Sequence, residues 1–291
     1  MSFSGVWAAS LTPLTADLDI DHTRFADHVG WLLENGCDGV ALFGSTGEAN
    51  SFSVAERTEA VDRLIAAGLP PTRMIAGAGA CAFPDAVALS THAAQRGLAG
   101  VLVTPPYYYK NVSDRGIFDF FRRLIDDVGN DWLRIVLYHF PRLVQVGFSE
   151  DLVAQLVRAF PQVVTGLKDS SGDLDRMKRL AGAHPSLAVL AGNEKLLREL
   201  KASGGAGCLT ASANLTSRLA QDVWQGAGDT ELAEYRDALS AAPFVPGLKQ
   251  IMADHSGDAS WLSIRPPLEP LSADAAAAFR AGLPGVVPNL R

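Results

Sequence analysis

Cysteine is scarce in this chain, and the few cysteines lie far apart. The three of them form no Cys-x-x-Cys pair and are odd in number, which argues against a disulfide framework. This usage is typical of a reducing compartment. We therefore expect a cytoplasmic protein in which each cysteine is a small buried apolar residue: Cys37, Cys81 and Cys208.

Long apolar runs and an excess of basic residues are also missing. No apolar run approaches the roughly 20 residues that a membrane span needs. Residues 1–5 have neither the charged nor the apolar region of a signal peptide. The formal net charge is −7, with 25 Lys and Arg against 32 Asp and Glu. We therefore expect no membrane association and no nucleic-acid partner.

Motifs for metals, dinucleotides and phosphates are missing too. The six histidines form no His-x-His or His-Glu-x-x-His pattern, so we expect no metal, and a metal-dependent aldolase is disfavoured. The glycines at 77–79 and 204–207 lack the Gly-x-Gly-x-x-Gly spacing of a dinucleotide site. Residues 204–207 also precede the last predicted strand, which is the wrong end for a phosphate-binding barrel.

Short apolar runs recur along the 291 residues and alternate with helical patterns. Most runs are apolar at consecutive positions, as parallel strands buried on both faces require. Eight strand–helix units predict an α/β protein with a (β/α)8 TIM barrel, and a doubly wound sheet is the alternative. The predicted strands are Val6–Ser10, Gly39–Phe43, Arg73–Ala78, Gly100–Thr104, Arg134–His139, Val163–Lys168, Leu187–Ala191 and Gly207–Thr210.

Helix starts are recognisable between these strands. Ser53 and Glu56 form a capping box ahead of an apolar pattern. Near residue 226 the pattern changes to helices only, so we expect the barrel in residues 1–226 and a C-terminal helical domain in residues 227–291. The predicted helices, two of them capped by Ser113 and Ser149, are Arg57–Ala67, Ala86–Gln95, Arg115–Val128, Glu150–Phe160, Glu194–Ala202, Ser217–Gln225, Thr230–Ser240, Pro246–His255 and Ala273–Ala281.

Lysine is infrequent, and only one lysine ends a predicted strand. Lys168 closes the run Val163–Lys168 and is followed by Asp169. An amine at the buried end of a strand is poorly solvated, which disfavours its charged form and frees it to attack a carbonyl. The alternative is a structural role in a partly buried Lys168–Asp169 ion pair.

Hydroxyl groups gather at the other predicted strand ends, where barrel enzymes place their sites. The turn Gly44–Glu48 offers backbone N–H groups and two hydroxyls that can bind a carboxylate or a phosphate. It can equally be an ordinary turn in which Thr46 caps locally. Tyr138 can be a proton donor or a core residue. Strand alternation points the next residue, His139, to the opposite face, where packing is its expected role.

Motifs at these strand ends also match a known pattern. They are Gly44–Glu48, Tyr107–Tyr108, Tyr138 before Pro141, Gly166–Asp173 and Gly207–Asn214. In this order, nearly end to end, the chain resembles the dihydrodipicolinate synthase / N-acetylneuraminate lyase family of Schiff-base pyruvate enzymes. The resemblance implies a lyase, a class I aldolase or synthase that needs no cofactor and no metal.

The resemblance implies that Lys168 forms an imine with the C2 carbonyl of pyruvate or another 2-oxo acid. The resulting enamine would attack an aldehyde, or the reverse cleavage would release one. Tyr138 would shuttle protons. Ser45 and Tyr108 would complete a hydroxyl relay, with Tyr108 contributed by a neighbouring subunit of a homodimer or of a homotetramer that is a dimer of dimers.

The remaining implied roles concern substrate binding. The hydroxyls of Ser45 and Thr46 would hold the carboxylate of the 2-oxo acid. Gly192 and Leu209 would line its pocket. Arg142 is the candidate for binding a carboxylate on the aldehyde.

The acceptor is where the sequence departs from the family. In the synthases an arginine two residues after the proline binds the carboxylate of the aldehyde, but Leu143 stands there and Arg142 lies one place earlier. His139 stands where the family usually has Asn. We therefore expect a hydroxy-oxo-acid or sugar-acid aldehyde as the partner. The alternative is a true 4-hydroxy-tetrahydrodipicolinate synthase, which joins pyruvate to aspartate semialdehyde for lysine biosynthesis. A remote alternative is a binding or regulatory barrel that has lost its chemistry.

Overall fold

The fold is a closed barrel of eight parallel strands with helices between them, as the alternating pattern predicted. The computed structural model describes residues 3–285. The strand order follows the sequence, which is the (β/α)8 arrangement. The strands are β1 (Gly5–Ala9), β2 (Gly39–Leu42), β3 (Met74–Gly77), β4 (Gly100–Val103), β5 (Ile135–His139), β6 (Val164–Asp169), β7 (Ala188–Ala191) and β8 (Gly207–Thr210).

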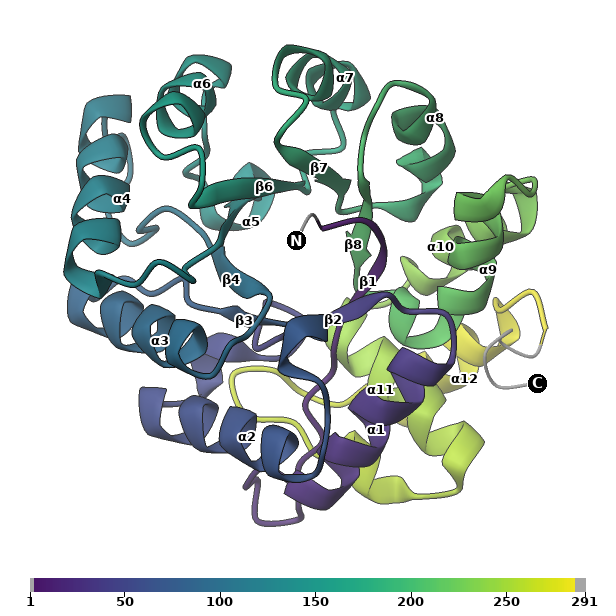
Figure 1. Ribbon diagram of the computed structural model, residues 1–291. Coiled ribbons are helices and arrows are strands. Elements are labelled where there is room, and N and C mark those ends of the chain that lie inside the picture. Colours follow the sequence, from purple (N-terminus) through teal and green to yellow (C-terminus); the bar gives the residue numbers. More distant parts are fainter. Residues whose placement is uncertain (1–2, 286–291) are drawn as a thin grey trace. The chain divides into compact units, whose positions relative to one another are not determined.

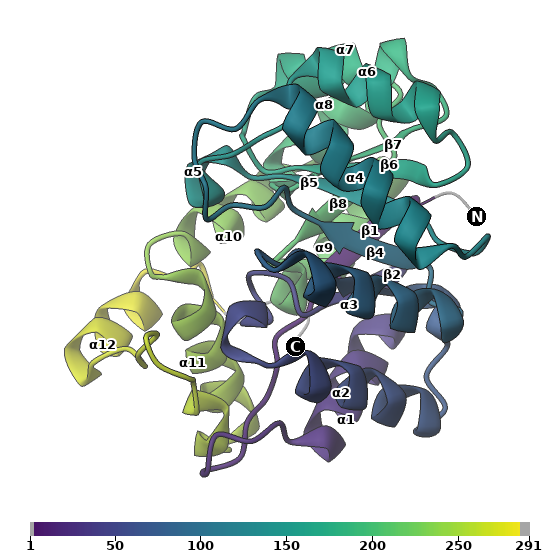
Figure 2. The ribbon, with the colours of Figure 1, turned by 90° about the vertical axis from the view of Figure 1, so that its left-hand side faces the viewer.

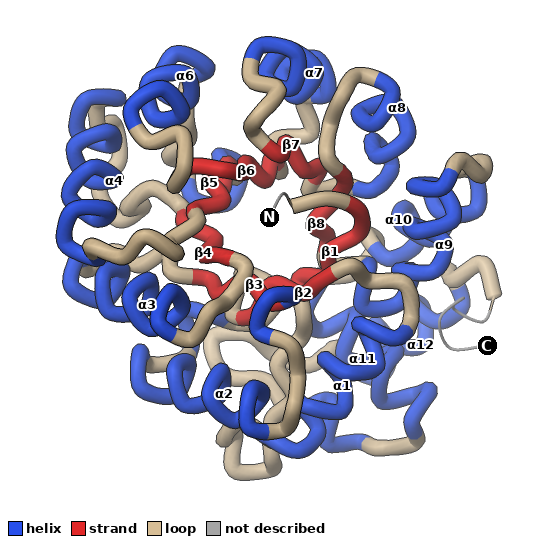
Figure 3. The backbone as a smooth tube through the Cα atoms, in the orientation of Figure 1, coloured by secondary structure: helices blue, strands red, loops and turns tan. Residues whose placement is uncertain are grey.

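The chain divides into two compact units, and the first comprises Met1–Gly5 and Pro70–Leu209. Its strands lie inside its longer helices (Figures 1 and 3). Seen from the side, α5 lies beyond the ends of the strands rather than among the outer helices (Figure 2). The helical elements are η2 (Pro71–Arg73), α3 (Phe83–Gln95), α4 (Asp114–Val128), α5 (Pro141–Val144), α6 (Glu150–Ala159), α7 (Leu174–Ala183), η3 (Glu194–Leu196) and α8 (Leu197–Ala202).

The second unit comprises Val6–Leu69 and Thr210–Arg291. An apolar cluster joins its C-terminal helices to Leu11 and Leu215, with Tyr235, Ile251 and Phe279 among its buried members. The helical elements are α1 (His22–Glu34), η1 (Ala49–Ser51), α2 (Val54–Ala66), α9 (Ala213–Gln225), α10 (Thr230–Leu239), α11 (Phe244–Ser256), η4 (Ala259–Leu262) and α12 (Ala273–Ala281). The predicted domain boundary after residue 226 falls at the end of α9 and stays a prediction.

Local signals placed the elements well. The capping box at Ser53 and Glu56 is formed, and Ser113 and Ser149 accept N-terminal amide hydrogen bonds as predicted. The prediction that every cysteine is buried is wrong for Cys81, which is exposed in the turn before α3. No helix within residues 3–285 combines the length and apolar character needed to span a bilayer. The cytoplasmic location stays a prediction.

The short helix α5 and two longer helices, α1 and α7, were not among those predicted; the two longer ones share a feature. Each carries a polar residue on its buried face, His28 on α1 and Arg176 on α7. A buried polar residue interrupts the apolar periodicity by which a helix is read from sequence. The N-cap signals, Asp21 and Asp173, were available: both side chains accept a hydrogen bond from the backbone three residues on.

The amide of Asn214 connects distant segments of the second unit. Its Oδ1 accepts hydrogen bonds from the Leu11 amide at 3.1 Å and from His28 Nε2 at 2.9 Å. Its Nδ2 donates to the carbonyls of Ala9 and Ala211, both at 2.7 Å. Because the acceptor is an amide oxygen, His28 carries its proton on Nε2. Burial lowers the pKa of His28 from 6.5 to about 4, although the Asn214 hydrogen bond opposes the shift.

We expect His28 to make the protein less stable in mild acid. In the unfolded chain His28 binds a proton below about pH 6.5, whereas in the folded protein it does so only near pH 4. Stability that is complete above pH 6.5 is therefore lost as the pH falls toward 4, by up to roughly 3 kcal/mol. Urea unfolding across this range measures the loss. His28→Gln keeps a donor for Asn214 but does not titrate, so its pH dependence should be shallower; equal slopes would contradict the assignment.

Candidate active site

Lys168 and Tyr138 lie opposite each other on neighbouring strands. They are register partners in the parallel pair β5–β6. The Lys168 Nζ lies 4.3 Å from the centroid of the Tyr138 ring, a cation–π distance. Only 5% of the Lys168 side chain surface is exposed, and Tyr138 is equally buried. The structure thus brings together the amine and the phenol that the sequence singled out.

Asp169 does not pair with Lys168, so the structural alternative for the lysine is wrong. The Asp169 Oδ2 accepts from Arg176 Nε of α7 at 3.1 Å. Its Oδ1 accepts from the amide of Ser171 at 2.8 Å and from the Ser171 hydroxyl at 2.5 Å. Side chains alternate faces along a strand, so Asp169 turns to the helices while Lys168 lies over Tyr138. The Asp169 carboxylate therefore pairs with Arg176 and not with Lys168.

Gly192 and Leu209 occupy the ends of the next two strands. The Gly192 amide donates to the Asp169 carbonyl at 2.7 Å, immediately after β7. A Cβ on Gly192 would come within 2.1 Å of the Ser170 Oγ and 2.9 Å of the Asp169 carbonyl. Only glycine allows so close an approach to the segment after Lys168. Leu209 is fully buried on β8.

The turn Gly44–Glu48 of the second unit is held by a buried ion pair that sequence reasoning missed. Glu48 has a left-handed φ of 55° and is buried. Its Oε1 accepts from Lys249 Nζ of α11 at 2.5 Å, and Lys249 also donates to the Ser263 carbonyl at 2.8 Å. Burial lowers the pKa of Lys249, an effect that the Glu48 carboxylate opposes. The two residues are far apart in sequence, so no local signal links them.

This anchoring leaves the two hydroxyl residues of the turn in different settings. Ser45 is exposed and Thr46 is buried. The Thr12 hydroxyl donates to the Gly47 carbonyl at 2.9 Å, which fixes the turn from behind. Carboxylate binding by Ser45 and Thr46 stays a prediction.

Tyr108 lies apart from the buried Lys168–Tyr138 pair. Its side chain is 75% exposed and contacts the ring of Tyr109 edge-on. The segment is joined to α5 by Lys110, which donates to the Tyr107 carbonyl and, at 2.9 Å, to the Val144 carbonyl. Within this chain Tyr108 is therefore not part of the buried pair.

Arg142 and Leu143 lie on α5, in the segment that connects β5 to α6. Both are exposed, Leu143 by 56%. Within residues 3–285, neither side chain forms a hydrogen bond or an ion pair that would indicate a role in binding a carboxylate. Their roles toward an acceptor stay predictions.

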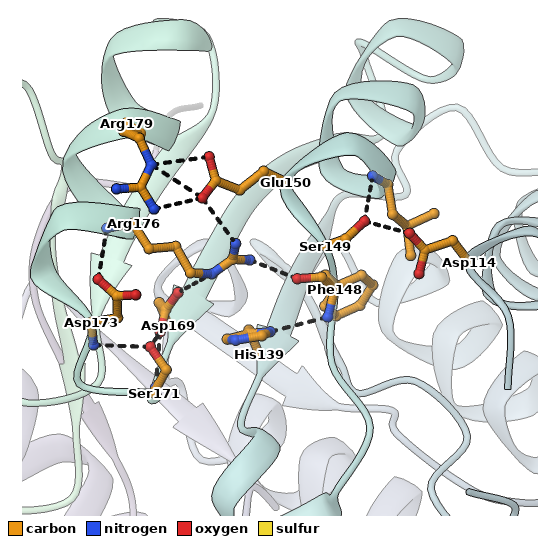
Figure 4. A network of polar contacts seen from close by, with 11 residues as sticks. Asp114, His139, Phe148, Ser149, Glu150, Asp169, Ser171, Asp173, Arg176 and Arg179 are labelled. Atoms are coloured by element: carbon orange, nitrogen blue, oxygen red, sulfur yellow. Dashed lines mark hydrogen bonds and ion pairs between the residues drawn. The ribbon is translucent and has the colours of Figure 1, made fainter. Parts of the chain in front are cut away.

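A network of polar contacts involves the neighbours of the two residues in sequence, Asp169 and His139 (Figure 4). Arg176 binds Asp169 and donates through Nη2 to the Phe148 carbonyl at 2.8 Å. His139 is buried on β5, and its Nδ1 accepts from the Phe148 amide at 3.0 Å. As predicted, His139 lies on the face opposite Tyr138. Burial lowers the pKa of His139, with the Asp169 charge opposing the shift. Within residues 3–285, no group of three or more His, Cys, Asp or Glu side chains is arranged to hold a metal.

Known proteins are similar to this chain over most of its length. The model of the dihydrodipicolinate synthetase family matches residues 2–284. An uncharacterized DapA-like lyase of Chloroflexus aurantiacus is 34% identical, over 95% of each chain. A 4-hydroxy-tetrahydrodipicolinate synthase of Agrobacterium fabrum is 32% identical over 81% of this chain and 80% of its own.

Solved structures agree with the fold. The crystal structure of dihydrodipicolinate synthase from Agrobacterium tumefaciens has a TM-score of 0.91 and 34% identity, covering 96% of this chain and 97% of its own. YagE of E. coli, a protein of the same family crystallised in complex with pyruvate, has a TM-score of 0.82 and 26% identity, covering 96% and 97%.

Proposed function

Because the chain belongs to the dihydrodipicolinate synthetase family of lyases, we propose that it is a class I aldolase or synthase in which Lys168 forms a Schiff base with pyruvate or another 2-oxo acid. One observation carries the proposal: a buried amine lies 4.3 Å from the centroid of a tyrosine ring. The neighbouring carboxylate, Asp169, is bound to Arg176 instead. Within residues 3–285 no carboxylate pairs with the Lys168 amine, which leaves the amine available for attack on a carbonyl.

The proposed chemistry proceeds in balanced steps. The neutral Lys168 amine attacks the C2 carbonyl, and the carbinolamine loses water to give a protonated imine. The imine draws electrons from C3, which releases a proton and leaves an enamine. The enamine carbon bonds to the carbonyl carbon of an aldehyde, whose oxygen takes a proton, and the Lys168 imine is restored. Water then hydrolyses this imine, which releases the product as a 2-oxo acid and returns the free amine. Tyr138 is the group proposed to move protons at these stages.

Binding of the 2-oxo acid is assigned to further residues at the strand ends. Ser45 and Thr46 hold its carboxylate through hydroxyl and backbone N–H groups. Gly192 and Leu209 line the pocket. Tyr108 completes the proton relay from a neighbouring subunit of a homodimer or homotetramer. Its high exposure supports this, since most of its side-chain surface is accessible to another copy.

The acceptor is proposed to be a hydroxy-oxo-acid or sugar-acid aldehyde. The relatives include synthases of 4-hydroxy-tetrahydrodipicolinate, so pyruvate with aspartate semialdehyde is the alternative. Leu143 argues for the first choice, because an exposed apolar side chain stands where the synthases use arginine. A non-catalytic barrel is disfavoured because Lys168 and Tyr138 are both retained in contact.

The imine should be trapped on one lysine. Incubation with pyruvate and borohydride should add a reduced pyruvyl group to Lys168, detectable by mass spectrometry of peptides. Lys168→Ala should abolish the labelling, whereas Lys178→Ala, a surface control, should not. Labelling of any other lysine, or of none, would contradict the proposed mechanism. Activity should survive EDTA, and a loss that zinc reverses would favour a metal-dependent reaction.

Tyr138→Phe tests proton transfer with little change in packing. The variant removes one hydroxyl and keeps the ring over Lys168, so the fold and the cation–π contact should survive. Turnover should fall by about 10²- to 10⁴-fold if the hydroxyl moves protons. Steady-state kinetics beside a thermal melt separate this from unfolding. A near-normal rate would mean that Tyr138 is a core residue.

The third test concerns aspartate semialdehyde. If Leu143 makes the acceptor corner apolar, this aldehyde is a poor substrate because its carboxylate is desolvated without a partner. Leu143→Arg should then raise its kcat/KM. If Arg142 binds the carboxylate instead, Arg142→Ala should raise the KM about 10- to 150-fold. We expect the first outcome; a wild-type kcat/KM above about 10⁴ M⁻¹s⁻¹ would decide for the second.

A further inference from the structure

The peptide of Phe148 is held on both of its polar groups. Its N–H donates to His139 Nδ1 of β5 at 3.0 Å, and its carbonyl accepts from Arg176 Nη2 of α7 at 2.8 Å. Both side chains and Phe148 itself are buried. Figure 4 shows His139 and Arg176 approaching this peptide from different elements. Such a double contact fixes the position of one backbone unit more tightly than an ordinary loop is fixed.

Phe148 closes the segment that follows the proposed proton-transfer tyrosine. The segment 140–148 begins directly after His139, and the imidazole of the same residue contacts the end of the segment at Phe148. Gly147 packs against the ring: a Cβ there would come within 2.7 Å of His139 Cε1. The segment contains α5, with Arg142 and Leu143 exposed on it. Its shape is therefore set from inside by His139.

Arg176 is fixed in turn by the strand that carries the lysine. Its Nε donates to Asp169 Oδ2 at 3.1 Å, and Asp169 is the residue after Lys168. The Asp173 side chain caps α7 at the Arg176 amide at 2.9 Å. The segment after β5 is thus tied to β6 through Arg176, on the face away from the amine. A change on this outer face can move the segment without touching Lys168 or Tyr138.

The contact with Phe148 requires a neutral imidazole. Nδ1 accepts from an N–H, so a proton on Nδ1 would place a donor against a donor. Burial keeps the pKa of His139 low, with Arg176 acting in the same direction and Asp169 and Asp173 opposing. The protonation state agrees with the geometry.

We propose that His139 and Arg176 are positioning residues that determine aldehyde selectivity by fixing Phe148, and hence the segment 140–148. The inference rests on the proposed function, because it assigns this segment to the acceptor side of the same site. Lys168 and Tyr138 project from the other faces of β6 and β5, so formation of the imine with pyruvate does not depend on the Phe148 contact.

Two substitutions at His139 separate positioning from general structural support. His139→Asn keeps an acceptor oxygen near the place of Nδ1, whereas His139→Leu removes it. Borohydride trapping with pyruvate reports on the imine. Initial rates with pyruvate and glycolaldehyde, glyceraldehyde, succinic semialdehyde or aspartate semialdehyde report on the acceptor. Hydrogen–deuterium exchange of the peptide spanning 140–149 reports on the segment itself.

For His139→Leu we expect the KM for the preferred aldehyde to rise about 3- to 10-fold, the effect of one buried hydrogen bond. Discrimination among the four aldehydes should narrow, and exchange in 140–149 should quicken. Trapping with pyruvate should stay within about twofold of wild type. His139→Asn should keep both selectivity and protection. If His139→Leu does not fold, His139→Gln, whose amide reaches the place of Nε2 rather than Nδ1, takes its place with the same expectations.

Several results would overturn the inference. Equal losses in trapping and in aldehyde use would make His139 a general support of the fold. If exchange became faster but the aldehyde preference did not change, the segment 140–148 would not determine aldehyde selectivity. Unchanged exchange would mean that His139 does not hold the segment. Failure of wild type to be trapped by pyruvate would overturn the proposed function instead, and the exchange measurement would still decide the role of His139.

Discussion

The placement of Lys168 depends on the buried ion pair between Asp169 and Arg176. Two adjacent residues on β6 must face opposite ways, and the pair fixes which way each faces. Removing one partner of a buried pair leaves an uncompensated charge, at a cost of about 3–5 kcal/mol. A rotated β6 would separate Asp169 from Arg176 and move the amine away from the ring of Tyr138. The Asp169–Arg176 ion pair, on the side of β6 that faces the helices, therefore helps to keep the Lys168 side chain on the side that faces Tyr138.

Two buried lysines of this chain have different surroundings. Lys249 is nearly inaccessible, but it binds the Glu48 carboxylate and the Ser263 carbonyl, so its charge is compensated. Lys168 is equally buried and lies over the ring of Tyr138. An aromatic face stabilises a cation less than a carboxylate does. Burial alone therefore does not distinguish the two lysines, whereas the group that each amine contacts does.

The sequence predicted those parts of the fold that local chemistry specifies. The eight strands follow from consecutive apolar residues, and the caps at Ser53, Ser113 and Ser149 follow from residues three positions apart. Helices α1 and α7 escaped prediction because His28 and Arg176 are buried polar residues. Their burial is tolerated only because of partners such as Asn214, 186 residues away from His28, and Phe148, 28 residues away from Arg176. The Lys249–Glu48 pair also escaped prediction, because its two residues are 201 positions apart in the sequence.

Within the candidate site, the residues on strands could be predicted from the sequence, whereas the residues on connecting segments could not. Lys168, Tyr138 and the outward direction of His139 follow from strand position and alternation, so the sequence was sufficient for them. The segments that carry Tyr108 and Arg142 are not strands, so no alternation of side chains predicts which way these residues point. Their positions depend on side chains that bind backbone groups: Lys110 on the Val144 carbonyl, and His139 on the Phe148 amide. Selectivity that resides in such segments can change through a single anchoring residue, while the strands keep the amine and the phenol in register.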